Sequence, residues 1–269
     1  MPTSSPSAIP SFFAALGRPA IRALGEMGAV VLFFLHGVTS GWTARGQLGK
    51  IIRQVFFIGV KSVFVISLIG LFTGMVLGIQ GYYTLVKFGS EGLLGAAVAL
   101  SLIRELGPVL TAIMLTGRAG SSMTAEIGVM RISDQIDALE VMDIPAMGYL
   151  VNPRIIACLI SFPLLTAMFD VIGIIGGYLT GVVLLDINRG AYFQRINSAV
   201  EMYDVMGGFY KSIAFAVIVS TICCFMGYFT HLRRDGSGPE GVSNATTSGV
   251  VVSCVFILVS DYVLTSFLL

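Results

Sequence analysis

The sequence predicts an all-α integral membrane protein with an N-terminal interfacial helix, five transmembrane helices and a short amphipathic cytoplasmic helix between the second and third spans. Three observations lead to this fold class. Hydrophobic residues make up 55% of the 269 residues. Charged residues make up 12%, about half of their usual share in a soluble domain. Five separate apolar runs are each long enough to cross a bilayer, which takes about 20 residues.

The first 50 residues are expected to form an N-terminal tail and an interfacial amphipathic helix, ahead of a five-span membrane domain over residues 51–269. The apolar stretch from Met27 to Val38 holds only about a dozen residues, which is short for a span. We therefore place it in the plane of the interface, with Trp42 at headgroup level, and a sixth span is the alternative. The opening residues have no basic segment ahead of an apolar core, so we expect no cleaved signal peptide.

The five predicted spans are continuous apolar runs. They extend from Gln54 to Gly81, Gly92 to Gly117, Ile155 to Leu185, Met206 to Thr230 and Gly249 to Leu269. Strands of a membrane barrel need only about 10 residues and alternate in polarity, so helices fit these runs better.

Lys and Arg are unevenly divided between the two sides of these spans. The N-terminal segment and the connections after the second and fourth spans carry Arg18, Arg22, Arg45, Lys50, Arg53, Arg118, Arg131, Arg154, Arg233 and Arg234. The opposite side carries Lys87, Arg189 and Arg195. Because cytoplasmic loops are enriched in Lys and Arg, we expect a cytoplasmic N-terminus and a C-terminus on the far side.

Glycines recur every four residues in two of the spans. They are Gly70, Gly74 and Gly78 in the first span and Gly173, Gly177 and Gly181 in the third. This spacing lines one face of a helix and lets another backbone approach closely. We expect two helix-packing faces, within one chain or between two copies. The alternative is that glycine is simply common in membrane helices.

The second span holds two adjacent charges, Arg104 and Glu105, near the middle of its apolar run. A charged side chain at this depth costs at least about 2.5 kcal/mol. Neighbours on a helix point about 100° apart, so the two do not face each other squarely. Pro108 removes a backbone hydrogen bond to residue 104 and favours a kink. A polar cavity wall, a structural ion pair and a proton relay are all open interpretations.

Besides Lys61 in the first span, three further charges fall inside predicted spans. Lys211 lies near the outer end of the fourth span, where it either snorkels to the headgroups or faces an anionic headgroup inside a cavity. Asp170 and Asp261 are each expected to pair with a neighbouring helix, although their spacing names no partner.

The connection over about residues 118–150 has the spacing of one or two short amphipathic helices. Its apolar side chains are Met123, Ile127 and Met130, then Ile136, Leu139 and Met142, and its acidic ones are Glu126, Asp134, Asp137, Glu140 and Asp143. An apolar stripe beside an acidic face suits docking into the groove of another protein. A helix lying on the membrane is the alternative, and the negative cytoplasmic leaflet disfavours it.

Several function classes are excluded by what the sequence lacks. It has no GxxxxGK[ST], HExxH or GxSxG motif, and its net charge of +1 gives no basic field for nucleic acid. Its four cysteines lie in apolar runs without metal-ligand spacing. We therefore predict no catalytic residue, metal ligand or cofactor on this chain.

The charged motif of the second span and the connection after it resemble the MlaE (YrbE) permease family. The resemblance rests on Arg104–Ala112, Gly117–Gly120, Ala125–Arg131 and Gln135–Met142, and on Glu240–Val242, Ala245–Thr247 and Val250–Val251 further along. It covers the chain from about Gly46 to the end, whereas the first 40 residues match only in type. Ala119 and Ser121–Ser122 stand where relatives often have other small residues, and small size is kept.

The resemblance implies the permease subunit of an ABC-type system that moves phospholipids between the inner and outer membranes of a Gram-negative envelope. It implies a homodimer in the bacterial inner membrane, with a cytoplasmic N-terminus and a periplasmic C-terminus. Two cytoplasmic ATPase subunits would carry the ATP and Mg, and a ring of MCE-domain proteins would sit on the periplasmic face.

The resemblance also implies roles for individual residues. The segment Glu126–Met142 would be the coupling helix that enters the ATPase groove. Its docking residues would be Glu126, Met130, Asp134, Ile136, Asp137, Leu139 and Glu140. Arg104 and Glu105 match polar positions at the lipid cavity near the dimer interface, and Lys211 is a further candidate that no motif surrounds.

Two other functions are set against this one. The first is an ion- or proton-coupled secondary transporter that uses Glu105. Five spans do not divide into the equal halves of an inverted repeat, and the amphipathic connection would then have no purpose. The second is a membrane scaffold without transport, which leaves the costly charges of the second span unexplained.

Overall fold

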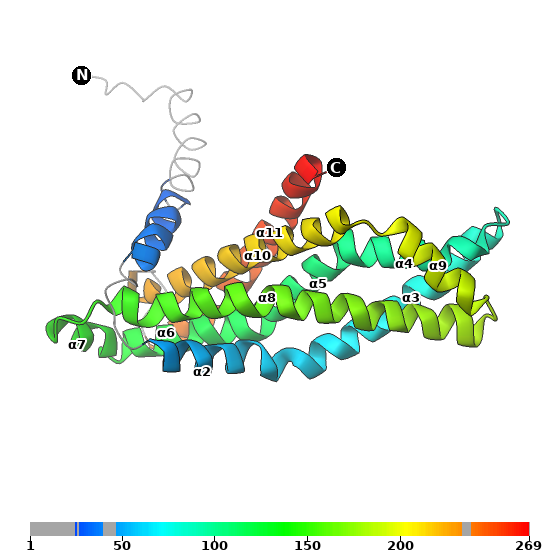
Figure 1. Ribbon diagram of the computed structural model, residues 1–269. Helices are drawn as coiled ribbons and strands as arrows, with labels where there is room; N and C mark the ends of the chain where they lie inside the picture. The colour runs from blue at the N-terminus through cyan, green and yellow to red at the C-terminus, as the bar shows by residue number, and fades with distance from the viewer. Residues whose placement is uncertain (1–24, 26, 40–46, 233–237, 269) are drawn as a thin grey trace, which may run out of the picture.

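The computed structural model describes residues 25, 27–39, 47–232 and 238–268, and this part of the chain is helical without a strand (Figure 1). Its five long apolar helices span Leu48–Val86, Glu91–Ile132, Ala146–Leu184, Met202–Tyr228 and Pro239–Leu268. Each overlaps one predicted span, so the all-α, five-span fold is confirmed.

The N-terminal apolar helix, Met27–Thr39, is shorter than a span, as predicted. Phe33 anchors it on the end of the fourth span, where its ring centroid lies 5.6 Å from that of Phe225 and 5.7 Å from that of Tyr228. Several residues used in the sequence predictions lie outside the described residues: Arg18, Arg22, Trp42, Arg45, Arg233 and Arg234. The opening residues, on which the expected absence of a signal peptide depends, also lie outside them.

The first two spans are built from several helical segments. The first consists of α2 (Leu48–Ile58), a 3₁₀ turn η1 (Val60–Ser62) and α3 (Val63–Val86). The second consists of η2 (Glu91–Leu93), α4 (Leu94–Ser101), a π-helical turn η3 (Leu102–Leu106), α5 (Gly107–Leu115), a second π turn η4 (Thr116–Gly120) and α6 (Ser121–Ile132). The second span was predicted to end at Gly117, but α6 carries it on to Ile132, so the first part of the amphipathic connection prolongs this span.

The remaining segments complete the bundle. They are α7 (Gln135–Val141), α8 (Ala146–Tyr178) with a third π turn η5 (Leu179–Leu184), α9 (Arg189–Ala199), α10 (Met202–Tyr228), η6 (Thr230–Leu232) and α11 (Pro239–Leu268). The short α7 and the N-terminal helix lie at one end of the bundle, and α9 lies at the other (Figure 1).

Helices α3 and α8 pack side by side through the two glycine rows (Figure 1). Gly74 meets the backbone of Gly173, and Gly70 and Gly78 face the backbone of α8 on either side of this crossing. A side chain at Gly74 would overlap the Gly173 carbonyl, so only glycine permits this approach. Gly177 and Gly181 also face side chains of α4. Both rows therefore serve packing within one chain.

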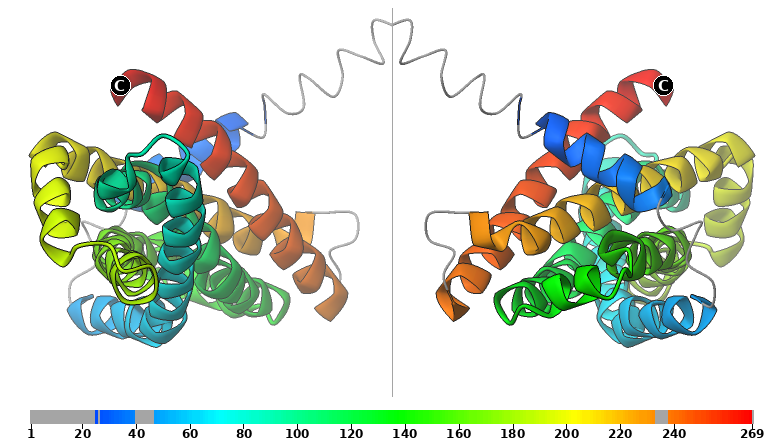
Figure 2. Two further views of the ribbon diagram at one scale, coloured as in Figure 1. Left: turned by 90° about the vertical axis from the view of Figure 1, so that its right-hand side faces the viewer. Right: turned by 90° about the vertical axis from the view of Figure 1, so that its left-hand side faces the viewer.

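The fifth span lies obliquely along the outside of the bundle (Figure 2). Only 11% of its most apolar window is buried, against 61% for the fourth span. Its uncovered apolar side chains include Val251, Val255, Tyr262 and Phe267. Lipid or a second protein surface must cover this face.

Candidate functional site

The two charges of the second span sit in the π turn Leu102–Leu106. The amide of Gly107 bonds the carbonyl of Leu102, five residues back, which widens the helix at this point. Pro108 has no amide hydrogen to offer the Arg104 carbonyl. That carbonyl instead accepts a hydrogen bond from Lys211 Nζ at 2.9 Å. The predicted break in the helix is thus a π turn, a feature frequent at functional sites.

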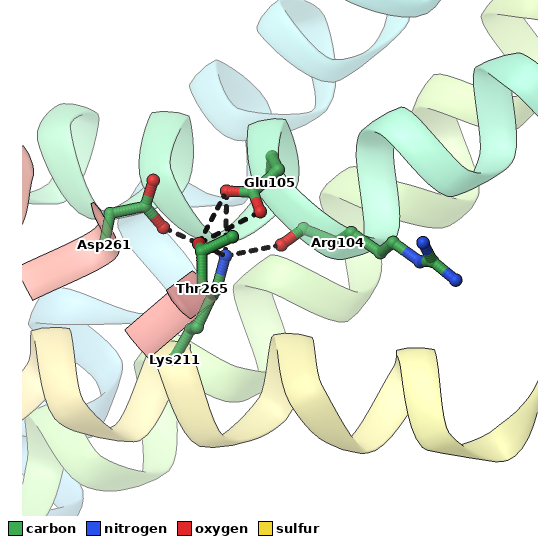
Figure 3. Close-up of polar contacts among 5 residues, drawn as sticks. All are labelled: Arg104, Glu105, Lys211, Asp261 and Thr265. Atoms are coloured by element: carbon green, nitrogen blue, oxygen red, sulfur yellow. Dashed lines mark hydrogen bonds and ion pairs between the residues drawn. The ribbon is translucent and has the colours of Figure 1, made fainter. Parts of the chain in front are cut away.

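Lys211 of α10 is the centre of a buried polar cluster (Figure 3). Besides the Arg104 carbonyl, its Nζ donates to Glu105 Oε2 at 2.8 Å and to Thr265 Oγ1 at 2.7 Å. Asp261 Oδ1 forms an ion pair with it at 3.1 Å. Because the Lys211 side chain is only 3% exposed, the snorkelling interpretation is wrong. Three bonds use its three donors, so Lys211 organises the wall of the site rather than offering a free cation.

Glu105 and Thr265 close this cluster from the second and fifth spans. The Thr265 hydroxyl lies 3.1 Å and 3.3 Å from the two carboxylate oxygens of Glu105. With Lys211 donating to both groups, the cluster ties α11 to α10 and to the π turn. The fourth span thereby supplies the counter-charge of Glu105, and the fifth span supplies a hydroxyl to Glu105 and a second carboxylate, Asp261, to Lys211.

Arg104 points away from Lys211 and Glu105, as the 100° angle between neighbours requires (Figure 3). Its Nε donates to Asp204 Oδ1 at 2.7 Å, and Asp204 is itself held by the Glu201 amide in the capping box of α10. The Arg104 side chain is 42% exposed. Within the described residues only Nε has a partner, so the two terminal nitrogens face open space.

These residues line a pocket of about 220 Å³ between the second, fourth and fifth spans. Its walls are Arg104, Glu105, Tyr203, Asp204, Gly207, Gly208, Lys211, Thr265 and Leu268. Gly208 lets α10 approach the π turn, because a side chain there would meet the Ile103 carbonyl. The pocket thus offers the two terminal guanidinium nitrogens of Arg104, whose Nε is paired with Asp204, on a wall whose other charges are also paired.

Among the lining residues that the sequence did not single out, Asp204 and Thr265 are the two that hydrogen-bond to Arg104, Glu105 or Lys211. The signal for Asp204 is its spacing of seven from Lys211, which puts both on one face of α10. The signal for Thr265 is its spacing of four from Asp261 on α11. The expectation that Asp170 pairs with a neighbouring helix is wrong for the described residues. Its buried Oδ1 has no partner among them, and it lies against Gly107, where α5 begins after the π turn.

The predicted coupling segment, Glu126–Met142, consists of two helices, which is one of the two arrangements that its spacing allowed. A break at Ser133 and Asp134, where φ is +57° at Asp134, separates α6 from α7. Ile136 is 0% exposed in a cluster that includes Phe33, so its prediction as a docking residue is wrong. Glu126 forms an ion pair with the buried Arg154 at 2.6 Å, so that side chain is already engaged within the chain.

The outer surface of α7 is acidic, with an apolar tip. Asp137 accepts from Arg131 Nη1 at 2.6 Å, and Glu140 accepts from the Tyr228 hydroxyl at 3.0 Å, while both carboxylates remain solvent-exposed. The exposed residues of this face are Asp134, Gln135, Asp137, Ala138, Glu140, Val141 and Met142. Met130 and Leu139 are half-buried and pack beneath them. The sequence did not single out Val141, which is 88% exposed.

No cluster of three His, Cys, Asp or Glu side chains able to hold a metal ion occurs in the described ranges. All four cysteines are free thiols, and Cys158, Cys223 and Cys224 are fully buried. The ionisable groups that gather in the spans therefore do so as ion pairs and hydrogen bonds.

Comparison with known proteins agrees with the resemblance. The family model for the permease MlaE matches residues 51–267. The chain is 41% identical to an intermembrane phospholipid transport system permease protein MlaE of Haemophilus influenzae, over 96% of this chain and 97% of the relative. It is 40% identical to a probable ABC transporter permease protein of Rickettsia bellii, over 93% and 95%. It is 35% identical to the chloroplastic protein TRIGALACTOSYLDIACYLGLYCEROL 1 of Arabidopsis thaliana, over 89% and 65%.

The matched range overlaps all five spans and contains the polar cluster and α7. This chain is a multi-pass membrane protein that belongs to the MlaE permease family.

Proposed function

We propose that this chain is the permease subunit of an ATP-driven phospholipid transporter that connects the inner and outer membranes. The observation that carries the proposal is the pocket between the second, fourth and fifth spans, where the Arg104 fork faces open space within an apolar bundle. A guanidinium recognises a phosphate through two parallel hydrogen bonds, and the surrounding helices offer acyl chains an apolar wall. The name of the Haemophilus relative supports phospholipid as the substrate.

The chain is proposed to act as a homodimer in the bacterial inner membrane, with its N-terminus in the cytoplasm and its C-terminus in the periplasm. Support comes from the uncovered apolar face of α11, which borders the same pocket through Thr265 and Leu268. A second copy covering this face would enclose the lipid cavity between two protomers. A ring of MCE-domain proteins would receive or deliver the lipid at the periplasmic end.

ATP hydrolysis is assigned to separate cytoplasmic ATPase subunits, which carry the ATP and Mg. The acidic face of α7 is their proposed docking surface, with Val141 and Met142 as its apolar contacts. Closure of the ATPases would push α7, and the Tyr228–Glu140 hydrogen bond links α7 to the end of α10. Because α10 also carries Asp204 and Lys211, its displacement reaches the pocket and narrows it by rigid-body rocking.

Reconstitution into vesicles tests the proposal as a whole. We expect phospholipid to leave the permease only when the ATPase subunits and ATP are present. Transport of lipid by the permease alone, driven by a proton or ion gradient, would overturn the proposal and favour the secondary transporter that uses Glu105.

Arg104→Gln is expected to lower the phospholipid that copurifies with the complex by about tenfold, since one charge-assisted contact is worth about 1.5–3 kcal/mol. Lipid phosphorus per mole of purified protein measures this directly. Lys87→Gln is the matched control, because Lys87 is an exposed cation outside the pocket. Equal lipid content in the Arg104 variant and the control would remove Arg104 from the proposed site.

Charge reversal of α7, with Asp137→Lys and Glu140→Lys together, is expected to abolish copurification of the ATPase. Two acidic contacts would become repulsive toward a groove that binds an acidic helix. Tyr228→Phe is the control, because it removes the intramolecular bond to Glu140 and leaves the outer face of α7 unchanged. If the double variant retains the ATPase, the docking assignment is wrong. If Tyr228→Phe also loses it, the position of α7 rather than its charge decides binding.

A further inference from the structure

We infer that the permease has a second lipid site, a groove at the cytoplasmic end of the seam between the second span and α11, where Arg118 binds the phosphate of a phospholipid from the cytoplasmic leaflet. The inference deepens the proposed function, on which it rests, by adding a loading site to the pocket at Arg104.

The groove has a volume of about 400 Å³ and is walled by three spans. Its apolar side chains are Val65 and Ile66 of α3, Ile113, Met114 and Leu115 of α5, and Val250 and Cys254 of α11. An apolar wall of this kind suits an acyl chain and offers nothing to a water-soluble anion. The groove therefore selects a lipid rather than free phosphate.

Arg118 closes one end of the groove from the second π turn, Thr116–Gly120. Its Nη1 donates to the Ser62 hydroxyl at 2.6 Å and to the Phe57 carbonyl at 3.2 Å, next to the break between α2 and α3. Both acceptors are neutral. None of the ion pairs in the described part of the chain includes Arg118.

This lack of a counter-charge sets Arg118 apart from the two cations of the Arg104 pocket. Arg104 is paired with Asp204, and Lys211 is paired with Glu105 and Asp261. The Phe57 ring, whose centroid lies 5.6 Å from Cζ of Arg118, offers a cation–π contact but no counter-charge. A guanidinium without a counter-charge beside lipid is costly, and an anionic headgroup supplies that charge at the membrane surface. Nε and Nη2 of Arg118 have no partner within the described residues, and two adjacent donors match two phosphate oxygens.

The groove and the Arg104 pocket lie along one seam. On α11, Val250 and Cys254 of the groove and Asp261 and Thr265 of the polar cluster recur at intervals of four, seven and four, which keeps them on one helical face. On the second span, Arg118 and Arg104 are 14 positions apart, or about 21 Å of helix.

That distance is most of the roughly 30 Å thickness of the hydrocarbon core. Along the second span, Glu91–Ile132, Arg118 lies nearer the end that joins α7 and Arg104 nearer the end that packs against α9. In the proposed orientation the α7 end is the cytoplasmic one. A phospholipid held at Arg118 would thus have to move about 21 Å along the apolar seam to reach the Arg104 pocket, which lies beside the polar cluster.

Site-specific photo-crosslinking tests the inference in the assembled complex. The photoreactive residue benzoylphenylalanine replaces Val250, and the membranes are labelled with ³²P-phospholipid. We expect labelled lipid at Val250 in the parent chain and about tenfold less with Arg118→Gln. Ser62→Ala removes one hydrogen bond of Arg118 and keeps its charge, so labelling should stay within about twofold. Release of the label by phospholipase identifies the adduct as a phospholipid.

Two results overturn the inference. One is equal labelling at Val250 with and without Arg118→Gln, which means that hydrocarbon fills the groove without headgroup recognition. The other is crosslinking of Val250 to a second copy of the chain in place of lipid. If Arg118→Gln does not fold, Arg118→Lys keeps the cation, and retention of at least a third of the labelling is expected. Loss of labelling in the folded Arg118→Lys variant assigns Arg118 a structural role and also overturns the inference.

A parallel probe at Leu268 separates this inference from the proposed function. Leu268 lines the Arg104 pocket, so Arg104→Gln should lower labelling there and leave Val250 unaffected. Labelling at Val250 that depends on Arg118, with none at Leu268, would refute the Arg104 pocket alone. Labelling at Leu268 that depends on Arg104, with none at Val250, would refute the loading site alone.

Discussion

Replacing Lys211 with methionine is expected to lower the free energy of unfolding by about 3 kcal/mol, the lower end of the cost of breaking a buried ion pair, because the carboxylates left behind on Glu105 and Asp261 are only partly buried. Lys211 forms a charged hydrogen bond with Glu105 and an ion pair with Asp261. It also donates a hydrogen bond to the Arg104 carbonyl, to which Pro108 has no amide hydrogen to donate. Methionine has a similar length and fills the space, so the loss reports the charge and the hydrogen bonds rather than a cavity.

Thermal unfolding of the purified permease, followed with a thiol-reactive fluorophore, measures this loss. Cys158, Cys223 and Cys224 are fully buried, so they react only after the bundle opens. Adding Glu105→Gln and Asp261→Asn to Lys211→Met should recover part of the stability, because the two carboxylates no longer carry uncompensated charge. If Lys211→Met unfolds at the temperature of the parent chain, the cluster does not stabilise the bundle in the way described.

The arrangement of the spans was readable from the sequence, and the interruptions within them were not. Lipid imposes a length and an apolar composition that a hydropathy pattern reports directly, and all five spans appear where those patterns predict them. The extension of the second span through α6 was missed because its composition turns amphipathic at the membrane surface while its backbone stays helical. The helix α9 was missed because Arg189–Ala199 lies in the connection between the third and fourth spans, where only the packing of Tyr192 against the bundle marks it.

The site could be predicted only in part, for a reason of distance along the chain. Arg104 and Glu105 stand out as charges in an apolar run, and Pro108 indicates the irregular turn that carries them. Their partners come from residues about 100 or more positions away, and no spacing within one helix names them. Ile136 shows the same limit: its periodicity marks an apolar face of α7, but only the folded chain shows that Phe33 and its neighbours cover it.

Gly74→Ala is expected to destabilise the permease by about 3 kcal/mol, at the upper end of the cost of overpacking a core. The added methyl group would coincide with the backbone of Gly173, and backbone atoms cannot rotate away as a flexible side chain can. Helices α3 and α8 would have to separate along their length and lose the contacts on either side of Gly74. The thiol-reactive unfolding assay reports the change, together with the yield of folded protein.

Gly49→Ala is the matched control, because Gly49 is also inside a helix and nothing lies within 4 Å of the position that a methyl group would take. There the substitution should raise stability by about 0.5–1 kcal/mol, since alanine loses less backbone entropy on forming a helix. If the free energy of unfolding falls with Gly74→Ala and rises with Gly49→Ala, then close backbone approach, rather than glycine content, holds α3 against α8. A stabilising effect at Gly74 would contradict the packing of the two glycine rows, and with it the position of the π turn that rests on α8.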